Sequence, residues 1–179
     1  MRVLITLDGS EISESAAVAV SQWAKDIKPE VLLLMVLHPD DIKQTSRGGY
    51  HYEVTPKGTM SGQLLAVADQ NPPPAESRTQ AIDRARSETS EYLASVARTY
   101  FPGVQTENIV DLEEDVPDAV TRTAERQGAD LVAMGTHGRT GLGQVMLGSV
   151  AEAVVRHATV PVLLVGPATR EQLQSDRAS

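Results

Sequence analysis

The stretch DLVAMGTHGRTGLGQVMLGSV, residues 130–150, is the most informative part of the sequence about the fold. It raises the question of what function requires so many residues without a side chain. It begins with a short apolar run, ends where helical spacing begins, and places five of the chain's 13 glycines within 14 residues. Glycine lets backbone N–H groups approach a ligand closely, and the N-terminus of a following helix adds unpaired donors. The stretch therefore predicts a strand, an anion-binding loop framed by Gly135, Gly138 and Gly148, and a helix. A long turn that binds nothing is the alternative.

Apolar runs and helical spacing alternate along the rest of the chain. Short apolar runs typical of strands cover residues 2–7, 31–37, 104–110, 130–135 and 160–166. Helical spacing covers residues 10–27, 77–96, 115 to about 127, and 149–158. This alternation predicts an α/β fold with an open, doubly wound, five-stranded parallel sheet in the order 3-2-1-4-5 and helices on both faces.

The predicted strand order bears on the glycine-rich loop, because the chain reverses direction between the first and fourth strands and a ligand crevice opens at their carboxyl ends. Asp8 follows the first strand and Gly135 ends the fourth. Ser149 is expected to be the N-cap of the last helix, with its hydroxyl toward a phosphate. The position of the loop thus favours a phosphate site over an empty turn.

Two familiar phosphate-binding motifs are excluded by the same sequence. All four lysines lie at or before Lys57, so the glycine-rich loop does not end in the Lys-Ser/Thr of the P-loop. The turn after the first strand is DGSE, which is not the dinucleotide fingerprint. His137 and Arg139 are the cationic residues within the loop, and Arg139 either contacts a phosphate or is solvated.

Composition limits the class of protein. The 179 residues suit one domain, placed at 1–166, with an insertion at about 38–77 and a tail at 167–179. The insertion, which lacks sustained periodicity, is either a lid or a mobile loop. The net charge of −8 argues against nucleic acid and anionic membranes as partners, and any bound phosphate must be held locally. No apolar segment reaches the length of a membrane span, so we expect a cytoplasmic protein.

Dedicated metal and hydrolase chemistry is not expected. The four histidines are scattered and there is no cysteine, which argues against a zinc site. No Gly-x-Ser-x-Gly elbow surrounds Ser10 or Ser149. We therefore expect no catalytic residues and at most slow hydrolysis of ATP, although an enzyme acting on a nucleotide stays open as a further alternative.

Two motifs of the chain resemble those of a known family. GTHGRTGLGQVMLGS follows the G-x2-G-x9-G-S/T pattern of the nucleotide-binding universal stress proteins, and VLITLDGSEIS is similar to their first strand with its terminal Asp. The resemblance covers residues 1–37 and 79–166. It implies a fold like that of the adenine nucleotide alpha hydrolases, with ATP as the ligand.

The resemblance also implies roles for ten residues. Thr6 and Asp8 would contact the adenosine, and Val36 would contact the adenine. Met134 and Gly135 would flank the nucleotide. The residues that would bind the phosphates are Gly138, Gly148, Ser149 and Val150, and Arg139 lies in the same loop. Mg²⁺ would accompany ATP, held mainly by phosphate oxygens and water.

VAEAVVRHATVPVLLV resembles the family's last helix and strand, and in many members that strand pairs across a homodimer. The strand at 160–165 would be an apolar sheet edge, which needs pairing or covering. A tail folded back over this edge is the competing interpretation. We thus expect a homodimeric, cytoplasmic, ATP-binding regulator or stress-tolerance factor. The alternative is a nucleotide-free homodimeric interaction module that acts by docking partners.

Overall fold

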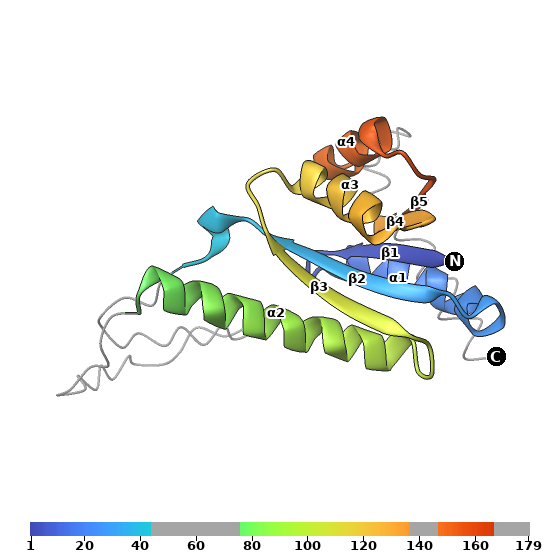
Figure 1. Cartoon of the computed structure of the whole chain (residues 1–179), viewed down its shortest axis with the longest axis horizontal. Helices are drawn as coiled ribbons and strands as arrows, with labels where there is room; N and C mark the ends of the chain where they lie inside the picture. Colours follow the sequence, from blue (N-terminus) through green and yellow to red (C-terminus); the bar gives the residue numbers. More distant parts are fainter. Residues whose placement is uncertain (44–75, 137–146, 167–179) are drawn as a thin grey trace, which may run out of the picture.

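A single parallel sheet forms the centre of the protein (Figure 1). The computed structural model describes residues 1–43, 76–136 and 147–166. Its strands are β1 (Arg2–Leu7), β2 (Glu30–Leu37), β3 (Thr106–Leu112), β4 (Leu131–Gly135) and β5 (Val162–Val165). They lie in the order β3-β2-β1-β4-β5 and all pairs are parallel, so the predicted sheet order is confirmed.

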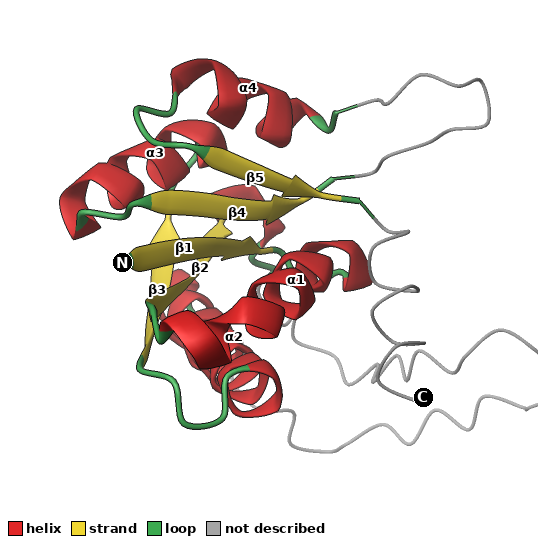
Figure 2. Cartoon of the chain, turned by 90° about the vertical axis from the view of Figure 1, so that its right-hand side faces the viewer, coloured by secondary structure: helices red, strands yellow, loops and turns green. Residues whose placement is uncertain are grey.

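Helices cover both faces of the sheet, as predicted (Figure 2). They are α1 (Glu11–Ile27), α2 (Arg78–Tyr100), α3 (Val116–Gln127) and α4 (Ser149–His157), with a short 3-10 turn η1 (Pro39–Asp41) after β2. One core lies between the sheet and α1 and α2, and the other lies between the sheet and α3 and α4. Because successive residues of a strand point to opposite faces, each inner strand must be apolar throughout.

The position of β3 differs from the sequence prediction by two residues. The predicted strand was 104–110, whereas β3 runs from Thr106 to Leu112 and pairs with β2 from Val31 to Leu37. Val104 instead closes a turn by donating its N–H to the carbonyl of Phe101. The length of the partner strand, rather than local hydrophobicity, thus sets where β3 begins and ends.

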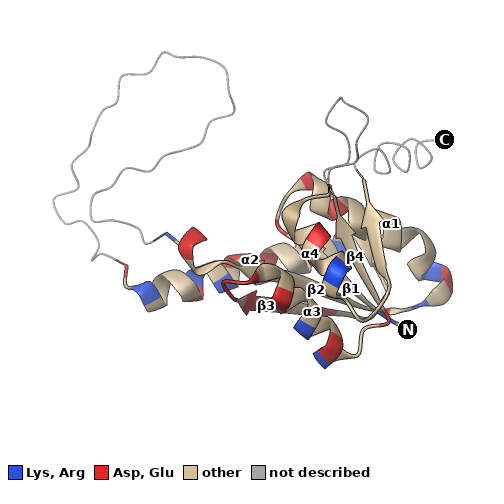
Figure 3. Cartoon of the chain, turned by 90° about the horizontal axis from the view of Figure 1, so that it is seen from above, with Lys and Arg blue, Asp and Glu red and all other residues tan. Residues whose placement is uncertain are grey.

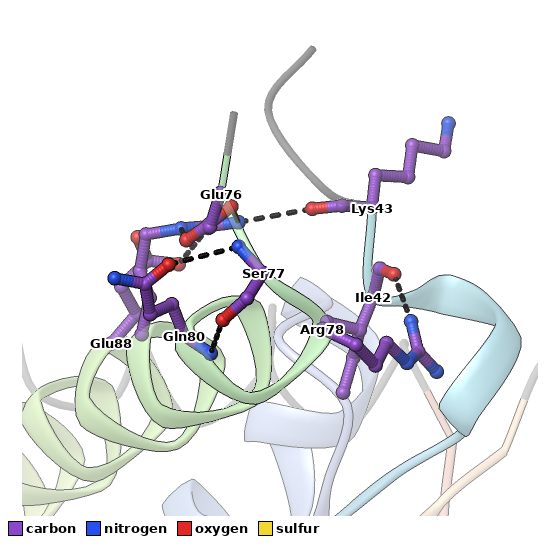
Figure 4. A network of polar contacts seen from close by, with 8 residues as sticks. Ile42, Lys43, Glu76, Ser77, Arg78, Gln80 and Glu88 are labelled. Atoms are coloured by element: carbon purple, nitrogen blue, oxygen red, sulfur yellow. Dashed lines mark hydrogen bonds and ion pairs between the residues drawn. The ribbon is translucent and has the colours of Figure 1, made fainter. Parts of the chain in front are cut away.

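Two arginines of α2 hold together the two flanks of residues 44–75 (Figure 4). Arg78 donates to the carbonyl of Ile42 at 2.7 Å, and Arg84 donates to the carbonyl of Lys43 at 3.0 Å. Arg84 also pairs with Glu76 at 2.9 Å. The chain therefore leaves and re-enters the fold at one point. The predictions for residues 44–75 and for the tail at 167–179 concern positions outside the described residues.

Charged residues are interspersed along the described part of the chain (Figure 3). Lysine and arginine alternate with aspartate and glutamate on several elements, and ion pairs of this kind join Arg2 to Glu30 and Arg122 to Asp118. None of the described helices combines the length and hydropathy that crossing a bilayer would require. The absence of nucleic-acid and membrane partners stays a prediction.

The carboxyl end of β4 packs against the first turn of α1. A Cβ added at Gly135 would lie 2.2 Å from the carbonyl oxygen of Ile12 and 2.8 Å from the Cα of Ser13. Both are backbone atoms of a helix that is itself packed on the sheet, so neither can easily move away. Gly135 is therefore required by the packing of α1 on β4, whatever else the residue contacts.

Gly135→Ala is expected to lower the free energy of unfolding by about 1–3 kcal/mol, because the added methyl group forces β4 and α1 apart. Gly166→Ala is the matched control, since a Cβ there has no neighbour within 4 Å. Urea denaturation of both variants measures the difference. Equal midpoints for the two variants would contradict the close packing.

Candidate functional site

A cleft of about 230 Å³ opens at the carboxyl ends of β1 and β4, the two strands between which the sheet order reverses. It lies on the side of the sheet covered by α3 and α4. The cleft brings together eight of the ten residues expected at the site, namely Thr6, Asp8, Val36, Met134, Gly135, Gly148, Ser149 and Val150. Gly138 and Arg139, like His137, lie outside the described residues.

One end of the cleft is apolar. It is lined by Leu34 and Val36 from β2 and by Val116 and Val120 from the start of α3. The two α3 valines are four residues apart and so lie on the same face of the helix. Such a slot between aliphatic side chains suits a flat, weakly polar group.

Asp8 lies at the end of β1, and the first turn of α1 fixes its position. The backbone N–H of Ser10 donates to Oδ1 of Asp8 at 2.9 Å, and the backbone N–H of Asp8 donates to Oγ of Ser13 at 3.2 Å. Gly9 permits this turn with a φ of 81°. The Ser10 hydroxyl caps α1 by accepting from the N–H of Ser13. The sequence DGSEIS thus forms the helix cap and orients Asp8 at the same time.

The same contacts set the charge of Asp8. Partial desolvation at the cleft acts to raise the pKa of Asp8, but hydrogen bonds from Ser10 and Ser13 outweigh it and lower this pKa below its ordinary value. The side chain is therefore a carboxylate at neutral pH. It can accept hydrogen bonds from hydroxyl or amino groups, and it disfavours a second anion beside it.

Two tyrosines of α2 fix the position of α1. Tyr92 and Tyr100 donate their hydroxyls to the two carboxylate oxygens of Glu14, at 3.2 and 2.9 Å. Burial and the nearby Glu14 carboxylate raise the pKa of Tyr92. The phenol therefore stays protonated, and α2 holds the first turns of α1 in place behind Asp8.

The N-terminus of α4 faces the cleft from the other side. The sequence predicted Ser149 as the N-cap, which is wrong: Gly148 is the N-cap and Ser149 is the first helical residue. No side chain of the described residues caps this helix, whereas Ser10, Ser77 and Asp115 cap α1, α2 and α3. The first N–H groups of α4 are therefore available to an anion, which the helix dipole also favours.

The sequence did not single out seven of the residues that line the cleft: Leu7, Ser13, Leu34, Val116, Val120, Thr136 and Ala151. Thr136 belongs to the glycine-rich motif, but it occupies a spacer position there. Val116 and Val120 have the spacing of ordinary core residues of a helix. Nothing in the local sequence indicates which helix end will lie over the strand ends, because that depends on the crossover connections.

The part of the chain that the structure describes contains no group of three or more His, Asp or Glu side chains placed to hold a metal ion.

Comparisons with known proteins identify the class of protein. The model of the universal stress protein family matches residues 1–166. The chain therefore belongs to the universal stress protein family. It is 28% identical to universal stress protein MJ0531 of Methanocaldococcus jannaschii, over 95% of this chain and 84% of the relative. It is 27% identical to universal stress protein MJ0577 of the same organism, over 92% of this chain and 93% of the relative.

Solved structures share the fold. The structure of MJ0577 superposes with a TM-score of 0.63 at 22% identity and covers 92% of this chain and 94% of that one. A universal stress protein from Archaeoglobus fulgidus in complex with dAMP gives 0.53 at 17% identity, over 92% and 97% of the two chains. A universal stress protein in complex with cAMP gives 0.54 at 17% identity, over 93% and 96%.

The lowered pKa of Asp8 predicts how its contribution to stability depends on pH. Its folded pKa lies below the unfolded value of about 3.9, so its hydrogen bonds stabilise the fold above that pH and are lost as the pH falls through the folded pKa. We expect Asp8→Asn to be less stable than the unmodified protein by under about 1 kcal/mol at neutral pH, because Asp8 is exposed.

Urea denaturation between pH 6 and pH 2.5 tests this expectation. The stability difference between the two proteins should shrink toward zero on acidification. Asp26→Asn, at the far end of α1, controls for the change in net charge. A difference that widens as the pH falls would show that the contacts of Asp8 do not favour its carboxylate.

Proposed function

We propose that this universal stress protein binds an adenine nucleotide, with ATP as the principal ligand, in the cleft at the ends of β1 and β4. In this role it acts as a cytoplasmic regulator or stress-tolerance factor. The observation that carries the proposal is that one cleft combines an apolar slot, a carboxylate that is ionised at neutral pH, and a helix N-terminus without a side-chain cap. These three features match a base, a sugar and a phosphate.

The order of the strands supports a direction for the ligand. Val36 lies on β2, Asp8 follows β1, and Gly148 and Ser149 come after β4 in the chain. The base would lie in the apolar slot, and the ribose hydroxyls would donate to Asp8. The phosphates would meet the N–H groups of α4, away from the Asp8 carboxylate. Met134 and Gly135 would flank the nucleotide.

Related proteins support adenine nucleotides as the ligand class. Two solved universal stress proteins of the same fold are complexes with dAMP and with cAMP. The glycine-rich motif of this chain follows the family pattern, so Gly138 and Arg139 are proposed to complete the phosphate site. Mg²⁺ would arrive with ATP and be bound by phosphate oxygens and water, since the described residues offer it no ligand cluster.

A carboxylate at position 149 separates phosphate binding from folding. Ser149→Asp places a negative charge in the first turn of α4, which favours the helix but repels phosphate. We expect the Kd for ATP to rise at least about tenfold, with a smaller effect on adenosine and no loss of thermal stability. Ser149→Asn is the matched control of similar size without the charge.

Isothermal titration with ATP and with adenosine measures these affinities. Equal ATP affinities for Ser149→Asp and Ser149→Asn would exclude phosphate binding at the start of α4. An unmodified protein that binds neither ligand would overturn the proposed function. The nucleotide-free interaction module would then be the better description.

We further propose a homodimer that forms through β5. The carbonyl of Pro161 accepts a hydrogen bond from Val132 of β4, and the carbonyl of Val165 accepts one from Thr136, the residue that follows β4. Alternation along the strand therefore directs the backbone N–H and C=O groups of Val162 and Leu164 away from β4, toward the edge of the sheet. Antiparallel pairing with the β5 strand of a second copy would satisfy these groups.

Leu164→Pro removes one outward N–H, and an edge strand tolerates proline at such a position. We expect this variant to be monomeric, whereas Leu164→Ala, which shortens the side chain but keeps the N–H, should stay dimeric. Light scattering coupled to size-exclusion chromatography gives the mass of each variant. A dimeric Leu164→Pro protein would rule out pairing through β5.

A further inference from the structure

Thr136 carries a buried hydroxyl that the fold leaves unused. The residue follows β4 directly, lines the cleft and is only 5% exposed. Among the described residues, its Oγ1 is the buried side-chain polar atom without a hydrogen-bond partner. We propose that this hydroxyl is a ligand contact of the cleft and is satisfied by a sugar or phosphate oxygen of the bound nucleotide. This inference rests on the proposed function.

The strand register brings the residues that follow β1 and β4 to the same cleft. Thr6 pairs with Met134 in the parallel β1–β4 ladder. Asp8 and Thr136 each follow this pair by two residues, and both line the cleft. The N–H of Thr136 donates to the carbonyl of Val165 on β5 at 2.9 Å, which fixes the residue at the edge of the cleft. Met134 packs in the core under α3 and α4, and the cleft opens on that face of the sheet.

The two serine hydroxyls in the first turn of α1 already have partners. Ser13 donates to the carbonyl of Ser10 at 2.8 Å, and the Ser10 hydroxyl accepts from the N–H of Ser13 at 3.1 Å. Thr136 has no such internal contact in the described part of the molecule. A buried hydroxyl without a partner lowers stability relative to a methyl group of the same size. A bound ligand that supplies the partner removes this penalty.

The position of Thr136 indicates which part of the ligand it contacts. It follows β4, and β1 lies between β4 and the strand β2 that carries Val36. The apolar slot proposed for the base is therefore the more distant end of the cleft. A threonine hydroxyl can donate to a phosphate oxygen and can also accept from a ribose hydroxyl. Both atoms belong to the sugar and phosphate portion of the nucleotide.

Thr136→Val tests the inference, because it removes the hydroxyl and nearly preserves the shape of the side chain. Without ligand, we expect the variant to melt at the same temperature as the unmodified protein or at a higher one. With ligand, we expect its Kd for ATP to be about tenfold higher, as for the loss of one hydrogen bond. Thr136→Ser, which keeps the hydroxyl, should bind ATP within about threefold of the unmodified protein.

Isothermal titration with adenosine, AMP and ATP shows which oxygen is involved. An equal loss for all three ligands assigns the contact to the sugar. A loss for AMP and ATP alone assigns it to a phosphate. Either pattern supports the role of Thr136 in ligand binding.

Two results would overturn the inference while leaving the proposed function intact. One is a Thr136→Val protein that binds ATP as tightly as the unmodified protein. The other is a ligand-free Thr136→Val protein that melts at a lower temperature, since the hydroxyl would then have a partner within the fold. An unmodified protein that binds none of the three ligands would overturn the proposed function itself, and this inference with it.

Discussion

The parallel pairing of β1 with β4 is the constraint on which the site depends. These strands are more than 120 residues apart in the chain, yet their register brings the ends of both strands together, so that Asp8 and the start of the glycine-rich loop line one cleft. Gly135 then allows the first turn of α1 to lie directly against the end of β4. Any shift in this register would separate the carboxylate from the loop and from α4. The cleft is thus a consequence of the sheet order as well as of the motif.

Electrostatics shows how an acidic protein could hold the phosphate proposed for this cleft. The net charge of −8 offers no general attraction to phosphate, and in the described residues the cleft is lined by no lysine or arginine. The N-terminus of α4, which no side chain of the described residues caps, provides local N–H donors and a favourable dipole. The turn that caps α1 keeps Asp8 ionised. The Asp8 carboxylate repels the negative end of a ligand, which is therefore favoured at the α4 side of the cleft. In the proposed complex, charge and hydrogen bonding would therefore orient the ligand together.

The arginine contacts at the start of α2 show how the fold accommodates a long connection. Arg78 and Arg84 bind backbone carbonyls that precede residue 44, and Arg84 also pairs with Glu76. Because both flanks are fixed to the same helix, β2 and α2 keep their places whatever the length of chain between them. Tyr92 and Tyr100 of α2 in turn bind Glu14 and so fix α1, whose first turn holds Asp8, against α2.

The sequence by itself determined the alternation of strands and helices, the strand order and the family, because these follow from periodicity, the crossover rule and a specific glycine spacing. It also identified Asp8, Gly148 and Ser149, which lie at element ends where a motif is readable. Tertiary structure alone decided the bounds of β3, which pairs with Val31 to Leu37 of β2, and the place of Gly148 as the N-cap of α4. It also decided that Val116 and Val120 close the cleft and that the Thr136 hydroxyl lacks a partner. These features depend on which residues from distant parts of the sequence pack near each position. The spacing of residue types along the chain does not determine that.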